Sequence, residues 1–172
     1  MDFFELINVR RSVRAFAAQP LADEHLQAIL AAANRAPSAG NRQAYEIFVV
    51  TDVRRKTRLV EAAGGQQFLA QAPVTLAFCA HPARSAERYG RRGVALYCVQ
   101  DATIACAYAQ LAVTALGLAS VWVGAFNEDA VRAAIGVGHD LRPVAFLPIG
   151  YAAEVPMERG RRALEDLVHR LE

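Results

Sequence analysis

A short segment near the N-terminus concentrates groups that could bind a phosphate. Residues 10–14 read Arg-Arg-Ser-Val-Arg, which places three guanidinium groups and one hydroxyl within five positions. A phosphate accepts forked hydrogen bonds from arginine and a further hydrogen bond from a hydroxyl. The same residues also fit a solvated helix end, because basic side chains interact favourably with the C-terminal pole of a helix. Both interpretations remain open on this segment alone.

Two further segments carry polar groups that a bound ligand could use. Residues 37–43 read Pro-Ser-Ala-Gly-Asn-Arg-Gln and lie between an expected helix and an expected strand. Small residues let a flat ligand approach the backbone, and side-chain amides can bind carbonyl and amide edges, although these are also ordinary turn residues. Residues 159–162, Arg-Gly-Arg-Arg, either add charge for a phosphate or form a solvated basic tail.

The usual catalytic and metal-binding patterns are missing from the sequence. The four histidines are scattered, and the sequence contains no HExxH, no GxSxG and no paired-cysteine zinc spacing. No GxGxxG follows an expected strand, so a Rossmann nucleotide site is not supported. We therefore expect no metal, and a cofactor that carries its own reactivity fits this chain better than side-chain catalysis.

Composition and charge indicate a globular chain with no affinity for nucleic acid or membrane. The 172 residues are 54% hydrophobic and 21% charged, which suits a single domain over residues 1–172. The formal net charge of +2 does not indicate nucleic-acid binding. The acidic start lacks the basic charge of a signal peptide, and no apolar run reaches membrane-spanning length. Three cysteines without CxxC spacing favour a reducing, cytoplasmic location.

Helices and strands are expected to alternate irregularly along the chain. Hydrophobic periodicity and capping residues predict helices that begin after Asp2 and Pro20 and others over 53–63, 96–116 and 128–135. Strand-forming runs occupy 45–50, 74–80, 119–124 and 143–149. Because strands and helices do not alternate strictly, the pattern favours an α+β sandwich over a doubly wound parallel sheet. The polar, Arg-rich segment 81–93 is expected to be a mobile surface loop.

Two of the expected elements bear on assembly. The helix 96–116 is rich in alanine, and small side chains would let it approach another helix closely at the centre of a dimer. A helix buried within one subunit fits the same pattern equally well. The tail ends in an amphipathic piece that contains Leu164, Leu167, Val168 and Leu171.

Five segments, taken in order, resemble one known family. These are residues 10–14, residues 36–43 (Ala-Pro-Ser-Ala-Gly-Asn-Arg-Gln), residues 122–126 (Trp-Val-Gly-Ala-Phe), residues 147–151 (Leu-Pro-Ile-Gly-Tyr) and the Arg-rich tail before Ala163. Each motif is weak alone, but the ordered set resembles the FMN-binding nitroreductase superfamily over essentially the whole chain. The likeness is greatest to short members that lack large lid insertions.

The resemblance implies both a fold and an activity. The fold would be a nitroreductase-like α-β-α sandwich with a mostly antiparallel central sheet, in a homodimer whose subunits exchange their C-terminal tails. The activity would be that of an FMN-dependent oxidoreductase that carries electrons from NADH or NADPH to nitroaromatics, quinones or similar small-molecule acceptors. The order would be ping-pong, so that the nicotinamide leaves before the acceptor binds.

The resemblance also implies roles for individual residues. The FMN phosphate would be held by Arg10, Arg11, Ser12, Arg159 and Arg161. Arg14 would be the catalytic residue beside N1 and O2 of the flavin, because a cation there stabilises the negative charge of the reduced ring. The partner subunit would supply Pro37, Ser38, Ala39, Asn41 and Gln43. Gln66 would contact the ring edge or ribityl chain, and Gly124 and Ala125 would lie against the ring.

Some positions depart from the family, and other functions fit parts of the pattern. Many relatives have Pro-Trp where this chain has Ala44-Tyr45, and Pro where it has Ala163. A specialised member, such as a reductive dehalogenase or flavin-cleaving enzyme, would use segment 81–93 as a lid, with Tyr89, Arg91 and Arg92 on the substrate. A non-enzymatic flavin-binding redox protein and a plain nucleotide- or anion-binding domain are the remaining alternatives.

Overall fold

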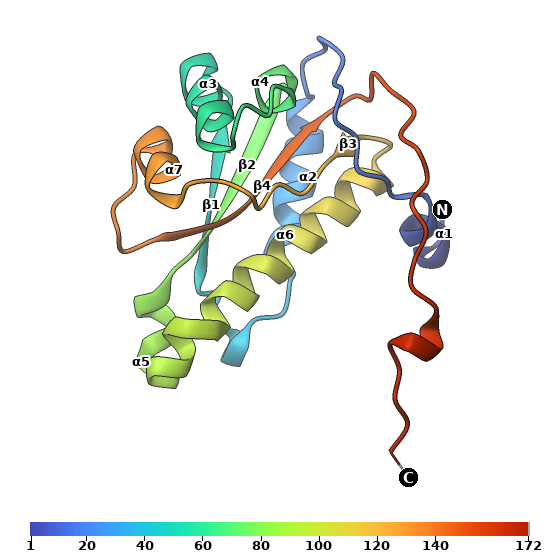
Figure 1. The fold of residues 1–172 in the computed structure, drawn as a ribbon. Coiled ribbons are helices and arrows are strands. Elements are labelled where there is room, and N and C mark those ends of the chain that lie inside the picture. Colours follow the sequence, from blue (N-terminus) through green and yellow to red (C-terminus); the bar gives the residue numbers. More distant parts are fainter. Residues whose placement is uncertain (172) are drawn as a thin grey trace.

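The computed structural model describes residues 1–171 and contains one four-stranded sheet between two layers of helices (Figure 1). The strands are β1 (Tyr45–Val50), β2 (Val74–Ala80), β3 (Ala119–Ser120) and β4 (Arg142–Gly150). They lie in the order β1-β2-β4-β3, and every neighbouring pair is antiparallel. The predicted α+β sandwich with an antiparallel sheet is confirmed.

Seven helices accompany the sheet in the described part of the chain. They are α1 (Phe3–Val9), α2 (Asp23–Asn34), α3 (Val53–Ala62), α4 (Phe68–Gln71), α5 (Pro82–Arg92), α6 (Cys98–Ala115) and α7 (Glu128–Ile135). Two short 3-10 turns, Ala39–Asn41 and Leu164–Asp166, and a π turn, Gly93–Tyr97, complete the elements. The predicted cap of α1 is present, since the Asp2 carboxylate accepts from the Glu5 backbone N–H at 2.9 Å.

The core has one half on each face of the sheet. Along β2 the side chains alternate, so that Leu76 and Phe78 face α2 and α6 while Ala77 and Cys79 face α3, α4 and α7. Every residue of β2 is buried because helices cover both faces of this strand. The sheet therefore forms a rigid centre, with α6 running diagonally across one face (Figure 1).

The prediction of a mobile loop over 81–93 is wrong, because this segment forms α5. Pro82 occupies the first turn, and His81 caps the helix by accepting the Arg84 backbone N–H at its Nδ1 atom, at 3.3 Å. Ser85 is fully buried where α5 crosses the π turn. A Cβ atom at Gly93 would lie 2.7 Å from the Ser85 carbonyl oxygen, so only glycine permits this close crossing.

Three element boundaries also differ from the sequence prediction. Strand β3 ends at Ser120 instead of position 124, although Val123 still exchanges two hydrogen bonds with Phe146, at 3.0 and 2.8 Å. Helix α6 begins at Cys98, after the π turn. The amphipathic piece of the tail is reduced to the 3-10 turn Leu164–Asp166, because its apolar side chains have no surface of this chain to cover.

Helix α1 and the tail leave apolar side chains uncovered. Helix α1 has no buried residue, and Phe3 and Phe4 are 58% and 71% exposed. In the tail, Val155 and Leu171 are 98% and 97% exposed. Apolar side chains exposed in this number within two segments would be covered if another surface packed against them. Within residues 1–171, none of the helices combines the length and apolarity that crossing a bilayer requires.

Candidate functional site

The N-terminal arginine segment is held between the edge of the sheet and the beginning of the tail. The Val13 N–H donates to the Ser120 carbonyl at 3.1 Å, just beyond α6. On its other side, Ala17 donates to Tyr151 and Ala153 donates to Ala15, both at 2.9 Å. The last two of these backbone pairs bring two ends of the chain together, since more than 130 positions of sequence separate residues 15–17 from residues 151–153.

The two predicted arginine segments meet in one cavity of about 450 Å³. The cavity is lined by all five residues expected to hold a phosphate and also by Arg14. Three residues of the tail that the sequence did not suggest complete the lining. Its lining consists of Arg10, Arg11, Ser12, Arg14, Glu154, Pro156, Met157, Arg159 and Arg161. We refer to it as the arginine cavity.

Positive charge dominates the arginine cavity. Five arginines line it, and Glu154 is its one lining carboxylate. Outside the lining, Glu158 pairs with Arg11 at 3.0 Å. Burial lowers the pKa of Arg10, and the neighbouring charges of Arg161 and Arg11 lower it further. An anion placed among these guanidinium groups would remove this repulsion, so the cavity has the chemistry of an anion site.

A second structured region is the loop of residues 38–44, which a buried carboxylate on α6 holds in place. Asp101 is 1% exposed, and its two oxygens accept the backbone N–H groups of Ala39 at 2.9 Å and Ala44 at 3.3 Å. The Ser38 hydroxyl accepts the Gln43 N–H at 3.0 Å. These bonds fix a tight turn in which Gly40, Asn41 and Gln43 have positive φ angles of 53°, 54° and 48°.

Sequence reasoning missed Asp101. The available signal was a single acid near the start of an alanine-rich, otherwise uncharged helical run, where a carboxylate needs a buried partner. Tyr45 lies nearby, and the pKa of its hydroxyl is raised by burial and by the Asp101 charge. The partners of the Asp101 carboxylate are thus two backbone N–H groups, and no ion pair among residues 1–171 includes it.

The loop and α6 enclose a mostly apolar cavity of about 470 Å³, which we call the loop cavity. Pro37, Ser38 and Ala39, three of the residues predicted to touch flavin, line one side. The other side is formed by Tyr97, Val99, Gln100, Asp101, Thr103 and Ile104. Asn41 and Gln43 belong to the loop, but they are not among the described residues that line this cavity.

The N-terminal segment that lines the arginine cavity and the loop that lines the loop cavity lie at opposite ends of α6 (Figure 1). Asp101, in the first turn of α6, holds the loop, whereas Ser120, just beyond the other end, holds Val13 and the arginine segment. Helix α6 has 18 residues and is therefore about 27 Å long at 1.5 Å per residue. Within one chain, the two predicted halves of the flavin site therefore do not meet.

The remaining predicted residues lie outside both cavities. Gly124 lines a smaller cavity of about 180 Å³ together with Phe126 and Arg142. Ala125 is exposed beside it. Gln66 lies in the turn between α3 and α4, where its Nε2 atom donates to the Ala63 carbonyl at 3.0 Å.

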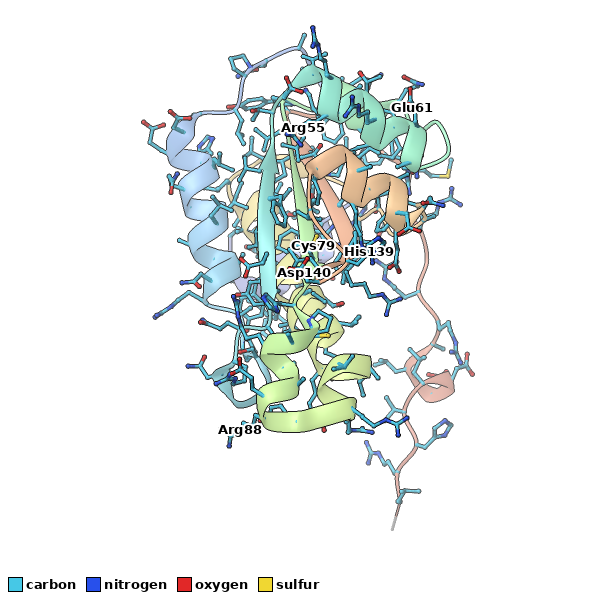
Figure 2. The ribbon with its side chains drawn as sticks, turned by 90° about the vertical axis from the view of Figure 1, so that its left-hand side faces the viewer. Arg55, Glu61, Cys79, Arg88, His139 and Asp140 are labelled. Carbon is cyan, nitrogen blue, oxygen red and sulfur yellow. The ribbon has the colours of Figure 1, made fainter. Side chains whose placement is uncertain are left out.

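The cysteines offer no reactive thiol in the described chain. All three are buried and free, and Cys79 lies within the sheet (Figure 2). Burial raises the pKa of Cys79 to about 12, and it also raises the pKa values of Cys98 and Cys106. Each therefore remains a thiol at neutral pH, and residues 1–171 contain no cluster of metal-ligating side chains.

Comparisons with known proteins agree on one family. Residues 7–67 and 60–151 match the Nitroreductase family. An NADH dehydrogenase of Thermus thermophilus is 32% identical over 92% of this chain and 91% of its own length. An FMN reductase [NAD(P)H] of Bacillus subtilis is 32% identical over 92% of this chain and 69% of its own. The structure of an NADPH:FMN oxidoreductase from Vibrio harveyi, complexed with NAD⁺, is 26% identical with a TM-score of 0.90, covering 98% of this chain and 76% of that one.

Proposed function

The chain belongs to the nitroreductase family, and from this premise we propose that it is an FMN-dependent oxidoreductase that uses NAD(P)H as its electron donor. Relatives in this family are an FMN reductase and an NADPH:FMN oxidoreductase. The observation that carries the proposal is the arginine cavity. It combines five guanidinium groups from two distant segments with one lining carboxylate, Glu154, and burial together with the charges of Arg161 and Arg11 lowers the pKa of Arg10.

The arginine cavity fits the phosphate end of FMN. Arg10, Arg11 and Ser12 would hold the phosphate, with Arg159 and Arg161 closing the cavity from the tail. Arg14 lines the same cavity, so its cation would lie further along the flavin, where it favours the reduced ring. When bound, the flavin would supply two-electron transfer between the nicotinamide and an acceptor, and this chain's residues would bind and orient it.

We propose a homodimer because the two halves of the site lie at opposite ends of α6. In a dimer, the arginine cavity of one chain would face the partner's loop, with Pro37, Ser38, Ala39, Asn41 and Gln43. The uncovered apolar side chains of α1 and the tail support such an assembly, since a second chain would bury them. We propose as part of this dimer that the two subunits exchange their C-terminal tails. Gln66, Gly124 and Ala125 would complete the ring site.

The acceptors that we propose are nitroaromatics, quinones and similar flat molecules, reduced in ping-pong order. The loop cavity supports this class because most of its accessible surface is apolar, as in typical sites for small aromatic ligands. A planar acceptor would bind there by apolar contact after the oxidised nicotinamide has left.

The purified protein should be yellow, and its visible absorbance should bleach when NADH or NADPH is added without oxygen. Return of the colour with a quinone or nitroaromatic would complete the proposed cycle. Bound FMN without NAD(P)H oxidation would indicate a non-enzymatic redox protein instead. A protein that stays colourless after FMN is added would leave only an anion-binding domain. Turnover confined to halogenated substrates would favour the specialised enzymes.

Arg14→Ala should slow flavin reduction while leaving much of the flavin bound. The variant removes the cation that stabilises charge on the reduced ring, and a loss of about 1.4 kcal/mol corresponds to a tenfold slower step. Stopped-flow bleaching by NADPH would measure the rate. Arg162→Ala is the matched control, because Arg162 lies outside the arginine cavity. Equal reduction rates for Arg14→Ala and the parent would remove Arg14 from the mechanism.

A further inference from the structure

Helix α5 and the π turn carry a compact group of two arginines and two tyrosines, Arg88, Tyr89, Arg92 and Tyr97, which we call the Arg–Tyr cluster. The Tyr89 and Tyr97 rings meet edge to face with their centroids 5.0 Å apart. The Arg88 guanidinium lies 5.6 Å from the Tyr89 ring centroid, and that of Arg92 lies 5.4 Å from the Tyr97 centroid. Arg92 Nε also donates to the Tyr97 hydroxyl at 2.9 Å. Each ring thus orients one guanidinium.

The arginines of the cluster lack acidic partners, unlike their neighbours. Arg84 pairs with Glu46 of β1 at 2.7 Å, and Arg42 of the loop pairs with Glu87, so both pairs fasten α5 to its neighbours. Among residues 1–171, no ion pair includes Arg88 or Arg92. The positive charge of the cluster is therefore available to an anion from outside the chain.

The cluster lies directly against the loop that we assign to the flavin of the partner subunit. Tyr97 lines the loop cavity together with Pro37 and Ser38. A Cβ atom at Gly40 would overlap with the Tyr89 hydroxyl, and it would lie 3.2 Å from Arg88 Nη1. Figure 2 shows Arg88 at the outer end of α5, where its side chain projects from the molecule.

We propose that the Arg–Tyr cluster binds a planar aromatic group bearing an anion, on a substrate that reaches the flavin; this inference rests on the proposed function. A tyrosine face packs against an aromatic ring, and a guanidinium forms forked hydrogen bonds to a phosphate or carboxylate. Two substrates of this enzyme class carry that chemistry. One is the adenosine 2′-phosphate end of NADPH, and the other is an aromatic acceptor with a carboxylate.

The test compares the double variant Arg88→Gln/Arg92→Gln with the parent holoenzyme. Steady-state rates are measured with NADPH and NADH as donors, and with para-nitrobenzoate and nitrobenzene as acceptors. The expected result is that the kcat/KM preference for the anionic member of one pair falls about tenfold, through KM with kcat unchanged. Replacing both arginines by lysine should restore part of the preference, because lysine keeps the charge without the fork. Arg54→Gln on α3, which packs on the other face of the sheet from α6 and the loop cavity, is the control.

The two arms distinguish the source of the anion. A fall in the NADPH-to-NADH ratio assigns the cluster to the donor phosphate, and a fall in the nitrobenzoate-to-nitrobenzene ratio assigns it to an acceptor carboxylate. Unchanged ratios in a variant with full FMN content overturn the inference and leave the proposed function intact. A parent that prefers neither anionic substrate overturns it too. A parent that binds no FMN in a titration defeats both the inference and the proposed function.

Discussion

Replacing Arg10 and Arg161 together by alanine is expected to weaken FMN binding by about 100-fold or more. Both line the arginine cavity, and their mutual repulsion contributes to the lowered pKa of Arg10. A bound phosphate turns that repulsion into charge-assisted hydrogen bonds, each stronger than a neutral one. Fluorescence titration of the apoprotein with FMN would measure the loss.

Riboflavin provides the internal control for this variant, because it has the flavin ring without the phosphate. Its affinity should stay within about twofold of the parent value, since no phosphate contact is lost. The apoprotein should keep its melting temperature, because the double variant removes two like charges. Arg162→Ala should bind FMN as the parent does, since this residue lies outside the cavity. Equal losses for FMN and riboflavin would show that the cavity does not hold the phosphate.

Asp101→Ala is expected to cost about 2–4 kcal/mol in the free energy of unfolding and to weaken flavin binding as well. Without the carboxylate, the buried N–H groups of Ala39 and Ala44 lose their acceptor. The left-handed turn at Gly40 and Asn41 would then relax and withdraw its contacts from the flavin. The stability and FMN affinity of Asp101→Asn should lie between those of the parent and Asp101→Ala, because one amide oxygen replaces two carboxylate acceptors. Chemical denaturation and FMN titration would give the two quantities.

Mixed dimers separate the effect of Asp101 on the loop from a general loss of stability. A dimer of one Asp101→Ala chain and one Arg10→Ala/Arg161→Ala chain contains an intact cavity on the first chain and an intact loop on the second. If the loop serves the partner's flavin, this mixed dimer regains one full-affinity site, although the homodimer of either variant has none. If each chain builds its site alone, mixing restores nothing. Co-expression with two affinity tags would isolate the mixed species.

The sequence predicted the layers of the fold well because their signals are local. The strands β1 and β2 and the helices α2 and α7 appear where periodicity and caps placed them. Helix α5 was missed because four arginines and few apolar residues hide its periodicity, and its stability comes from Arg84 and from the close crossing at Gly93. The amphipathic piece expected at the end of the tail is reduced to a short turn, because its apolar residues need a surface that one chain does not offer.

The candidate site was predictable in part. The family resemblance indicated that the segments around Arg10 and Arg159 would meet, and backbone pairing between residues 15–17 and 151–153 supplies the physical means. Asp101 was not predictable because its role depends on two backbone groups more than 55 positions away. The Arg–Tyr cluster depends on the reversal of the chain at Gly90, which periodicity does not reveal.

The burial of the three cysteines affects how well the protein resists oxidation in the presence of dioxygen. A reduced flavin that meets dioxygen releases hydrogen peroxide, and peroxide attacks the thiolate form of cysteine in preference to the thiol. With Cys79, Cys98 and Cys106 all protonated and out of contact with solvent, the oxidant would find no susceptible cysteine. An enzyme of this design would therefore need no thiol-reducing partner to withstand its own side reaction.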